Sequence, residues 1–193
     1  MKIQPLVEGY GDAEALPVLL RRLRDVSGAF SLEFHPPVRA GRAQLVSEAP
    51  LREFIRRALY QRRCSGILVL FDGDDDCPKK LAPKIRAWAQ AEARQVPCEV
   101  VIAQREYEAW LFSVLDPAQQ PRDPESVRNA KGRLPKGYSE TRHQAPLTAR
   151  FDLASAYRTC RSFRRMVRAF GLLAEGAGLP LTDWPPSSWK NSP

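Results

Sequence analysis

Short apolar runs alternate with longer segments of helical periodicity along the first 115 residues of the chain. The short runs predict strands, whereas apolar residues that recur every three or four positions predict helices. Strands are expected over 3–7, 31–35, 67–71 and 98–103. Helices are expected over 13–26, 50–63 and 78–94. Strands that alternate with helices are typical of a parallel sheet, so the predicted fold is α/β, with a mostly parallel sheet of about four strands flanked by helices.

The clear pattern ends near residue 115. Residues 116–150 are rich in proline, glycine and charged residues, and they predict a long loop. Asp152 has the residue type of a helix N-cap, and a helix is predicted from there to residue 173, followed by an irregular tail. We therefore expect an α/β core over residues 1–115 and a C-terminal basic loop, helix and tail, residues 116–193, that pack on this core.

Acidic residues follow three of the four predicted strands. The carboxyl ends of parallel strands share one edge of a sheet, where ligands bind, so these acids are expected to converge. Side chains alternate along an extended chain, which predicts that Asp72 and Asp74 point the same way. Glu106 and Glu108 cannot share one helix face, so at most one of them is expected at the site unless Glu106 still belongs to the end of the strand. The candidate ligands for Mg²⁺ or Mn²⁺ are Glu8, Asp72, Asp74, Asp76, Glu106 and Glu108. The alternative is a solvated acidic turn after a core strand.

The positive charge of the chain is concentrated in its second half. The formal net charge is +8, and residues 122–168 contain 12 Lys and Arg against 4 Asp and Glu. Arginine supplies 23 of the 30 basic residues, which suits bidentate contacts with phosphate. This distribution predicts a polyanionic partner, with a solvated basic face as the alternative. The candidate contacts to nucleic acid are Lys131, Arg133, Lys136, Arg158, Arg161, Arg164, Arg165 and Arg168.

Other sequence features bound the cellular setting. The four cysteines are widely spaced and form no C-x-x-C pair, so reduced thiols and no zinc site are expected. No apolar run approaches the roughly 20 residues of a membrane span, and the first residues do not resemble a signal peptide. The expected location is the cytoplasm, without membrane contact.

Two short motifs carry a resemblance to a known superfamily. Val7-Glu8-Gly9 after the first strand and Phe71-Asp72-Gly73-Asp74 after the third resemble, in order and spacing, the Toprim domain of topoisomerases, primases and overcoming-lysogenization-defect (OLD) nucleases. The opening Val7-Glu8-Gly9-x-Gly11-Asp12 and the segment 105–110 look like a stand-alone bacterial Toprim-like family of unknown function, many members of which are encoded beside an ATPase. The resemblance covers residues 1–115 and extends toward 173. It implies a Rossmann-like Toprim fold, a Mg²⁺-dependent acidic site and phosphodiester chemistry.

The leading hypothesis for function is a metal-dependent nuclease that acts on DNA or RNA, as the effector of an ATPase-linked bacterial defence system against phage. Asp72 and Asp74 would then hold the metal ion, and Glu8 would be a further ligand or the general base toward water. One alternative is a non-catalytic Toprim-fold subunit that binds or regulates a partner. Another is a transferase that holds a metal nucleotide through Asp72 and Asp74.

Overall fold

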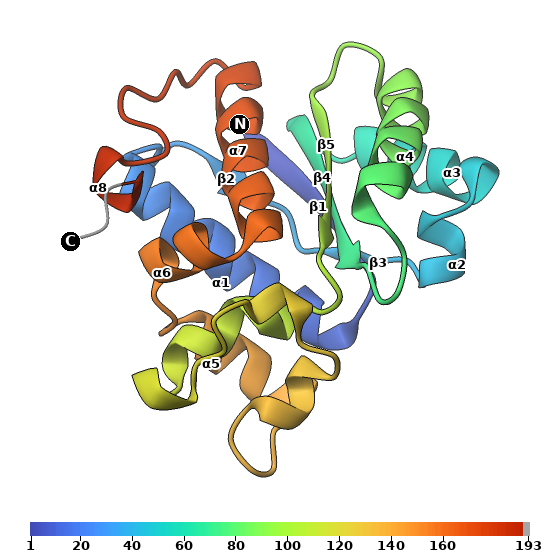
Figure 1. Ribbon diagram of the computed structural model, residues 1–193. Coiled ribbons are helices and arrows are strands. Elements are labelled where there is room, and N and C mark those ends of the chain that lie inside the picture. The colour runs from blue at the N-terminus through green and yellow to red at the C-terminus, as the bar shows by residue number, and fades with distance from the viewer. Residues whose placement is uncertain (191–193) are drawn as a thin grey trace.

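A computed structural model describes residues 1–190 and contains a five-stranded sheet in which every pairing is parallel (Figure 1). The strands are β1 (Lys2–Val7), β2 (Glu33–Phe34), β3 (Val38–Arg39), β4 (Cys64–Asp72) and β5 (Cys98–Ala103). Their order is β2-β1-β4-β5, with β3 also paired to β1. The predicted α/β class with a parallel, Rossmann-like sheet is confirmed. Residues 191–193, the end of the predicted extension, lie outside the described part of the chain.

The strand predicted over residues 31–35 is only two residues long in the structure, and a second short strand, β3, follows it. β2 pairs with the first residues of β1, with Ile3 opposite Phe34, and β3 pairs with its last residues, with Val7 opposite Arg39. Pro36 and Pro37 separate the two, because proline has no N–H to donate to a ladder. The two short strands therefore pair with the two ends of β1.

Helices cover both faces of the sheet, and β4 shows the alternation that this requires. Leu68 and Leu70 belong to the hydrophobic cluster beneath α1 and α7, whereas Ile67, Val69 and Phe71 belong to the cluster beneath α3 and α4. Side chains alternate between faces along a strand, so a fully apolar run serves both layers. The helices of these layers are α1 (Tyr10–Ser27), α2 (Arg42–Leu45), α3 (Glu48–Leu59), α4 (Pro78–Ala93), α6 (Leu153–Thr159) and α7 (Arg161–Gly176).

The first helix begins earlier than the sequence predicts. The carboxylate of Asp12 accepts a hydrogen bond from the backbone N–H of Gly9 at 3.1 Å, and α1 starts at Tyr10. Pro17 lies in the interior of this helix. The ring leaves the Ala13 carbonyl without its usual i+4 donor, a cost that burial of Leu16, Leu19, Leu20 and Leu23 offsets.

Residues 116–150 form a chain of short turns that crosses below the carboxyl edge of the sheet (Figure 1). The segment follows the 3₁₀ helix η1 (Tyr107–Val114), and its turns are η2 (Pro117–Gln119), η3 (Pro124–Ser126), η4 (Ala130–Arg133), the π-helical η5 (Glu140–Gln144) and α5 (Ala145–Thr148). Ala130, Leu134 and Gln144 are buried, which anchors the segment. The expected long loop is therefore irregular but packed against the core.

The single helix predicted from Asp152 to residue 173 is divided in two. Asp152 caps α6 as predicted, because its Oδ1 accepts hydrogen bonds from Ala154 N and Ser155 N. The chain is extended at Cys160, and α7 starts at Arg161. The carboxylate of Glu125, from the preceding segment, accepts hydrogen bonds from Arg161 N at 2.7 Å and Ser162 N at 2.6 Å. This distant side chain satisfies the free N–H groups that begin the second helix.

The tail returns across α7. Trp184 Nε1 donates a hydrogen bond to Val167 O at 2.8 Å, and the ring lies against Gly171, where a larger residue would collide with it. The final short helix, α8 (Ser187–Lys190), buries Trp189.

The four cysteines are free thiols. Within residues 1–190, no helix is both long enough and apolar enough to cross a bilayer.

The Glu125 cap generates a stability prediction. Glu125→Ala leaves two helix N–H groups and the hydroxyl of Ser162 without their acceptor, so we expect the free energy of unfolding to fall by about 2 kcal/mol. Glu53→Ala, which removes only exposed ion pairs with Arg56 and Arg57 on α3, should cost less than about 0.5–1 kcal/mol. Urea unfolding of both variants measures the difference. Equal losses would contradict the capping role.

Candidate functional site

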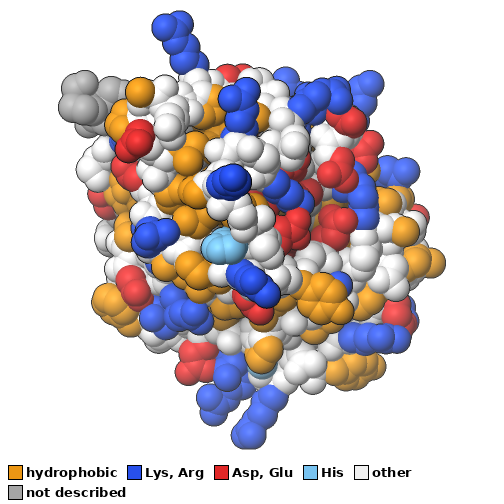
Figure 2. All heavy atoms as spheres, turned by 90° about the horizontal axis from the view of Figure 1, so that it is seen from below, with side chains coloured by type: hydrophobic (Ala, Val, Ile, Leu, Met, Phe, Trp, Pro, Cys, Tyr) orange, Lys and Arg blue, Asp and Glu red, His pale blue; other side chains and the backbone are white. Residues whose placement is uncertain are grey.

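A small cavity of about 100 Å³ lies at the carboxyl edge of the sheet, between the ends of β1 and β4, the first turn of α1 and residues 131–144. Figure 2 views the molecule from this edge and shows acidic side chains gathered to the right of centre, with Lys and Arg side chains around them. The cavity is lined by five carboxylates and one cation. The lining residues are Glu8, Gly9, Asp12, Asp72, Glu108, Lys131, Glu140 and Gln144.

Asp72, the last residue of β4, lines the cavity. Its Oδ1 accepts a hydrogen bond from Tyr107 N at 2.8 Å, which ties the end of β4 to η1. Burial raises the pKa of Asp72 well above its usual value, and the neighbouring charges of Asp12 and Glu108 raise it further. The ionised form is therefore unfavourable unless a cation is added.

Glu8 follows β1, the neighbour of β4 in the sheet, and so reaches the same edge. Burial is the main cause of its raised pKa, which the charge of Arg42 partly offsets. Its Oε2 atom is buried without any hydrogen-bond partner among the described residues and lies 3.9 Å from Arg42 Nη1. An acceptor left without a donor in this way can bind a cation or a proton.

Asp12, which accepts the hydrogen bond at the start of α1, also lines the cavity. Its Oδ1 accepts a hydrogen bond from Gln144 Nε2 at 2.9 Å, across 132 residues of sequence. Burial raises its pKa. Gly11 makes this contact possible, because a Cβ there would overlap with Oε1 of Gln144.

The two acids of the D-x-D sequence do not line the same cavity, contrary to the alternation expected of an extended chain. β4 ends at Asp72, and Asp74 has a left-handed backbone with φ of 48°. Its side chain is 61% exposed and lies 3.4 Å from Arg42 Nη1. The alternation of a strand therefore stops one residue too early to place Asp74 beside Asp72.

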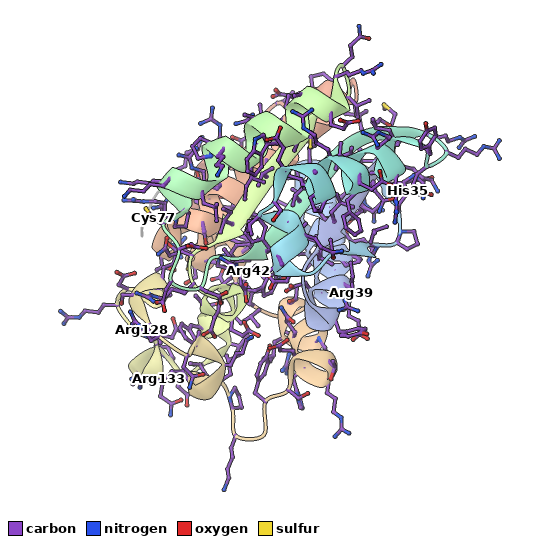
Figure 3. All side chains as sticks on the ribbon, turned by 90° about the vertical axis from the view of Figure 1, so that its right-hand side faces the viewer. His35, Arg39, Arg42, Cys77, Arg128 and Arg133 are labelled. Atoms are coloured by element: carbon purple, nitrogen blue, oxygen red, sulfur yellow. The ribbon has the colours of Figure 1, made fainter. Side chains whose placement is uncertain are left out.

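Arg42, at the start of α2, is a central residue that the sequence did not indicate (Figure 3). Its guanidinium donates hydrogen bonds to the carbonyls of Asp72 and Gly73. It also forms an ion pair with Asp76 at 2.5 Å. Arg42 thus gathers Asp74 and Asp76 on the side of β4 that faces α2, and it lies within reach of Glu8. A four-residue helix has no hydrophobic period that could have located it.

Of the two glutamates after β5, Glu108 lines the cavity and Glu106 does not. Glu108 accepts a hydrogen bond from the hydroxyl of Tyr138 at 2.8 Å. Burial raises the pKa of Glu108 to about 7, although the charge of Lys131 opposes the shift. Glu106 instead accepts a hydrogen bond from the backbone N–H of Lys131 at 3.1 Å. Glu106 thus holds residues 130–133 in place rather than facing the cavity.

Lys131 is the one predicted nucleic-acid contact that lies in the cavity. Its Nζ is 2.5 Å from Glu140 Oε1. Burial alone would lower the pKa of Lys131, but the hydrogen bond to Glu140 and the charges of Glu108 and Asp72 outweigh it and raise the pKa above its ordinary value. Arg133 and Lys136 are exposed on the same segment and do not line the cavity. Figure 3 shows Arg133 on this segment, below the sheet.

The predicted arginines of the last helices lie elsewhere. Arg158, Arg161, Arg165 and Arg168 are exposed, and Arg164 donates hydrogen bonds to the carbonyls of Tyr157 and Arg158. Arg168 acts electrostatically on Glu99, in the first half of β5, far along that strand from its carboxyl end. None of the five lines the acidic cavity.

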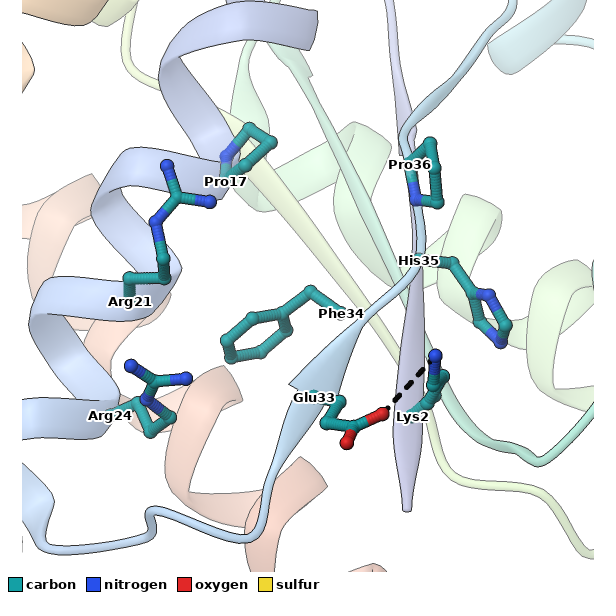
Figure 4. A pocket seen from close by; sticks show the side chains of 8 residues that line it. All are labelled: Lys2, Pro17, Arg21, Arg24, Glu33, Phe34, His35 and Pro36. Carbon is teal, nitrogen blue, oxygen red and sulfur yellow. Dashed lines mark ion pairs between the residues drawn. The ribbon is translucent and has the colours of Figure 1, made fainter.

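A larger hollow of about 400 Å³ lies away from these acids, between α1 and β2 (Figure 4). Arg21, Arg24 and Phe34 border it, and its one carboxylate, Glu33, pairs with Lys2 at 3.1 Å. Lys2 is the first residue of β1, so this hollow lies at the opposite end of that strand from Glu8. Size alone does not identify the chemical site here, because the convergent titratable groups lie in the smaller cavity.

The sequence model of a family described as a domain of unknown function, DUF4276, matches residues 7–170. The chain belongs to this family. The matched range contains every residue that lines the acidic cavity. Comparisons with curated proteins and with solved structures gave no match.

The acidic site of this DUF4276 chain has the right donors for a hard cation. Carboxylate oxygens are the ligands that Mg²⁺ and Mn²⁺ prefer, and Glu8 Oε2 is a buried acceptor without a donor. Within residues 1–190, however, no three acidic, histidine or cysteine side chains already converge closely enough to surround an ion. Arg42 and Lys131 supply positive charge in their place. The donors are therefore of the type that a divalent ion prefers, but within residues 1–190 they do not converge on one position, and the ion pairs compete with an ion for them.

The raised pKa of Glu108 gives a pH prediction. The folded protein binds this proton more tightly than the unfolded chain, so the stabilisation is present below pH 4.5 and is lost as the pH rises through about 7. We expect wild type to lose about 1–3 kcal/mol relative to Glu108→Gln across this range. Urea unfolding of both proteins in EDTA from pH 4.5 to 8 measures this difference. A difference that stays constant with pH would contradict the assignment.

Proposed function

We propose that this protein is a metal-dependent nuclease that hydrolyses phosphodiester bonds of DNA or RNA. The observation that carries the proposal is the meeting of Glu8 and Asp72, from the neighbouring parallel strands β1 and β4, in a cavity where five carboxylates face a single lining cation. Burial raises the pKa values of these acids, the neighbouring carboxylates raise them further, and both effects destabilise the folded protein. Groups with strongly shifted pKa values cluster at functional sites of proteins, where the unfavourable burial serves the chemistry.

Glu8 and Asp72 are the residues that would hold Mg²⁺ or Mn²⁺, and Asp74 is the next carboxylate along the chain. A bound ion would neutralise a phosphate oxygen and acidify a water molecule. Glu8 Oε2 accepts no hydrogen bond from the described residues, so it is also available to take a proton from water. Arg42 holds Asp74 and Asp76 beside the cavity and keeps the charge of this edge balanced when no ion is bound.

The resemblance to Toprim domains supports the same proposal. In that resemblance, a glutamate after the first strand and a D-x-D after a later strand form a Mg²⁺ site. Here Glu8 and Asp72 end adjacent strands of a parallel sheet. An ATPase partner, a role in phage defence and a cytoplasmic location belong to the proposal on the same ground.

A non-catalytic binding or regulatory subunit is the second candidate, and one observation favours it. Arg42 pairs with Asp74 and Asp76, and Lys131 pairs with Glu140, so the protein's own cations already neutralise part of the acidic edge. The metal-nucleotide transferase is supported less well, because Asp72 and Asp74 face different surroundings.

Substitution of the central acids tests the proposal. Asp72→Asn and Glu8→Gln preserve shape but remove the charge that binds a metal ion or accepts a proton, so we expect each to lower the cleavage rate by about 100-fold or more. The folded protein should be no less stable, since like-charge repulsion is relieved. Cleavage of plasmid DNA and of RNA with Mg²⁺ or Mn²⁺, with and without EDTA, measures the rate.

The matched control is Asp75→Asn. Asp75 belongs to the same acidic run, but it is 73% exposed, pairs with Arg105 and Arg128 and does not line the cavity. Its substitution should leave the rate within about twofold. Equal loss in all three variants would point to general surface charge, and cleavage that persists in EDTA would reject the metal requirement.

A further inference from the structure

An exposed aromatic residue lies next to the acidic cavity without taking part in it. Tyr10 is the first residue of α1, two positions after Glu8, and its side chain is 66% exposed. Phe30 and Tyr60 are also exposed, so it is the position of Tyr10 beside the candidate site, not its exposure alone, that suggests a function. Gly9 and Asp12, on either side of it in sequence, both line the cavity.

Arg39 covers one face of this ring. Its guanidinium carbon lies 3.2 Å from the centre of the Tyr10 ring, which is a close stacking contact. Because Arg39 occupies one face, the exposed area of Tyr10 comes from the opposite face and the edges of its ring. A cation–π pair at an exposed site contributes little to stability, so folding alone does not explain why a tyrosine is placed here.

The sheet register fixes the position of this pair. Arg39 lies in β3 opposite Val7 of β1, and Ala40 N donates a hydrogen bond to Val7 O at 2.9 Å. Arg39 is therefore held beside the residue that precedes Glu8. Figure 3 shows Arg39 near the first turn of α1, and Arg42 closer to the middle of the same edge.

The two arginines of this segment differ in what neutralises them. Arg42 lies within ion-pair distance of Glu8, Asp74 and Asp76. Arg39 is exposed and forms no ion pair with any carboxylate of residues 1–190. Its charge is thus available to an external anion, and its planar guanidinium suits phosphate.

We propose that Tyr10 and Arg39 form a platform that binds single-stranded nucleic acid, with an unpaired base stacked on the open face of Tyr10 and the adjacent phosphate held by Arg39. An aromatic ring beside a cation is the pairing that single-strand-binding surfaces use. Bases within a duplex have both faces covered by their neighbours, so the platform selects unpaired nucleotides. The inference rests on the proposed nuclease function and specifies its substrate as a single strand that passes Tyr10 to reach Glu8.

Binding without catalysis tests the platform. Fluorescence anisotropy in EDTA at low salt would use labelled DNA and RNA single strands of about 12 nucleotides and the matching duplexes. Tyr10→Leu should weaken single-strand binding about tenfold, since base stacking on an aromatic ring has effects of this size, whereas Tyr10→Phe keeps the ring and should stay within twofold. Arg39→Gln should weaken binding and flatten its salt dependence.

Tyr60→Leu is the matched control. Tyr60 is the most exposed tyrosine at 83%, and it follows α3, near the start of β4 and thus at the opposite end of that strand from Asp72. Its substitution should leave single-strand affinity unchanged. Circular dichroism of each variant checks that it is folded, and Tyr10→Phe provides a folded reference at the same position.

The outcomes separate this inference from the proposed function. Wild-type hydrolysis of bis(4-nitrophenyl) phosphate with Mn²⁺ tests the acidic cavity with a substrate too small to need the platform. If Tyr10→Leu binds single strands as tightly as wild type, if duplexes bind as tightly as single strands, or if wild type binds neither, the platform is rejected even where the small phosphodiester is hydrolysed. Tyr10-dependent binding without any hydrolysis would keep the platform and reject the nuclease.

Discussion

The burial of several carboxylates together at the carboxyl edge of the sheet is the constraint on which the site depends. Glu8, Asp12, Asp72 and Glu108 all have raised pKa values, and burial is the largest cause in each case. A buried carboxylate pays a large desolvation penalty unless a cation or hydrogen-bond donors compensate. Lys131, paired with Glu140, and Arg42, near Glu8, provide part of that compensation. A divalent ion would provide more, because it brings two charges into the same space.

The chain outside the α/β core completes this cavity. Lys131, Glu140 and Gln144 come from residues 116–150, and Gln144 binds Asp12 at the start of α1. Tyr138 binds Glu108, and Glu106 binds the backbone of Lys131, so the segment is tied down by the acids it covers. The same segment supplies Glu125 to the first turn of α7. Folding of this segment and formation of the site are therefore coupled.

The convergence of Glu8 and Asp72 could be predicted, because parallel strands deliver their carboxyl ends to one edge whatever their separation in sequence. The position of Asp74 could not be predicted, because its left-handed backbone after Gly73 breaks the alternation of the strand.

Other residues are placed by contacts with distant parts of the chain. No periodic pattern surrounds Lys131, Glu140 and Gln144, and their positions depend on such contacts. Arg42 lies in a helix of only four residues. The division at Cys160 depends on Glu125, 36 residues before Arg161. Sequence patterns describe local structure and cannot report such distant partners.

The most direct test of the central claim is the free energy of unfolding as a function of Mn²⁺ concentration at neutral pH. If Glu8 and Asp72 bind the ion, wild type should gain stability with the logarithm of the Mn²⁺ concentration above its dissociation constant. The double variant Glu8→Gln/Asp72→Asn should be at least as stable as wild type in EDTA and should gain nothing from Mn²⁺. A wild type that Mn²⁺ does not stabilise, or a double variant that gains as much as wild type, would contradict the account.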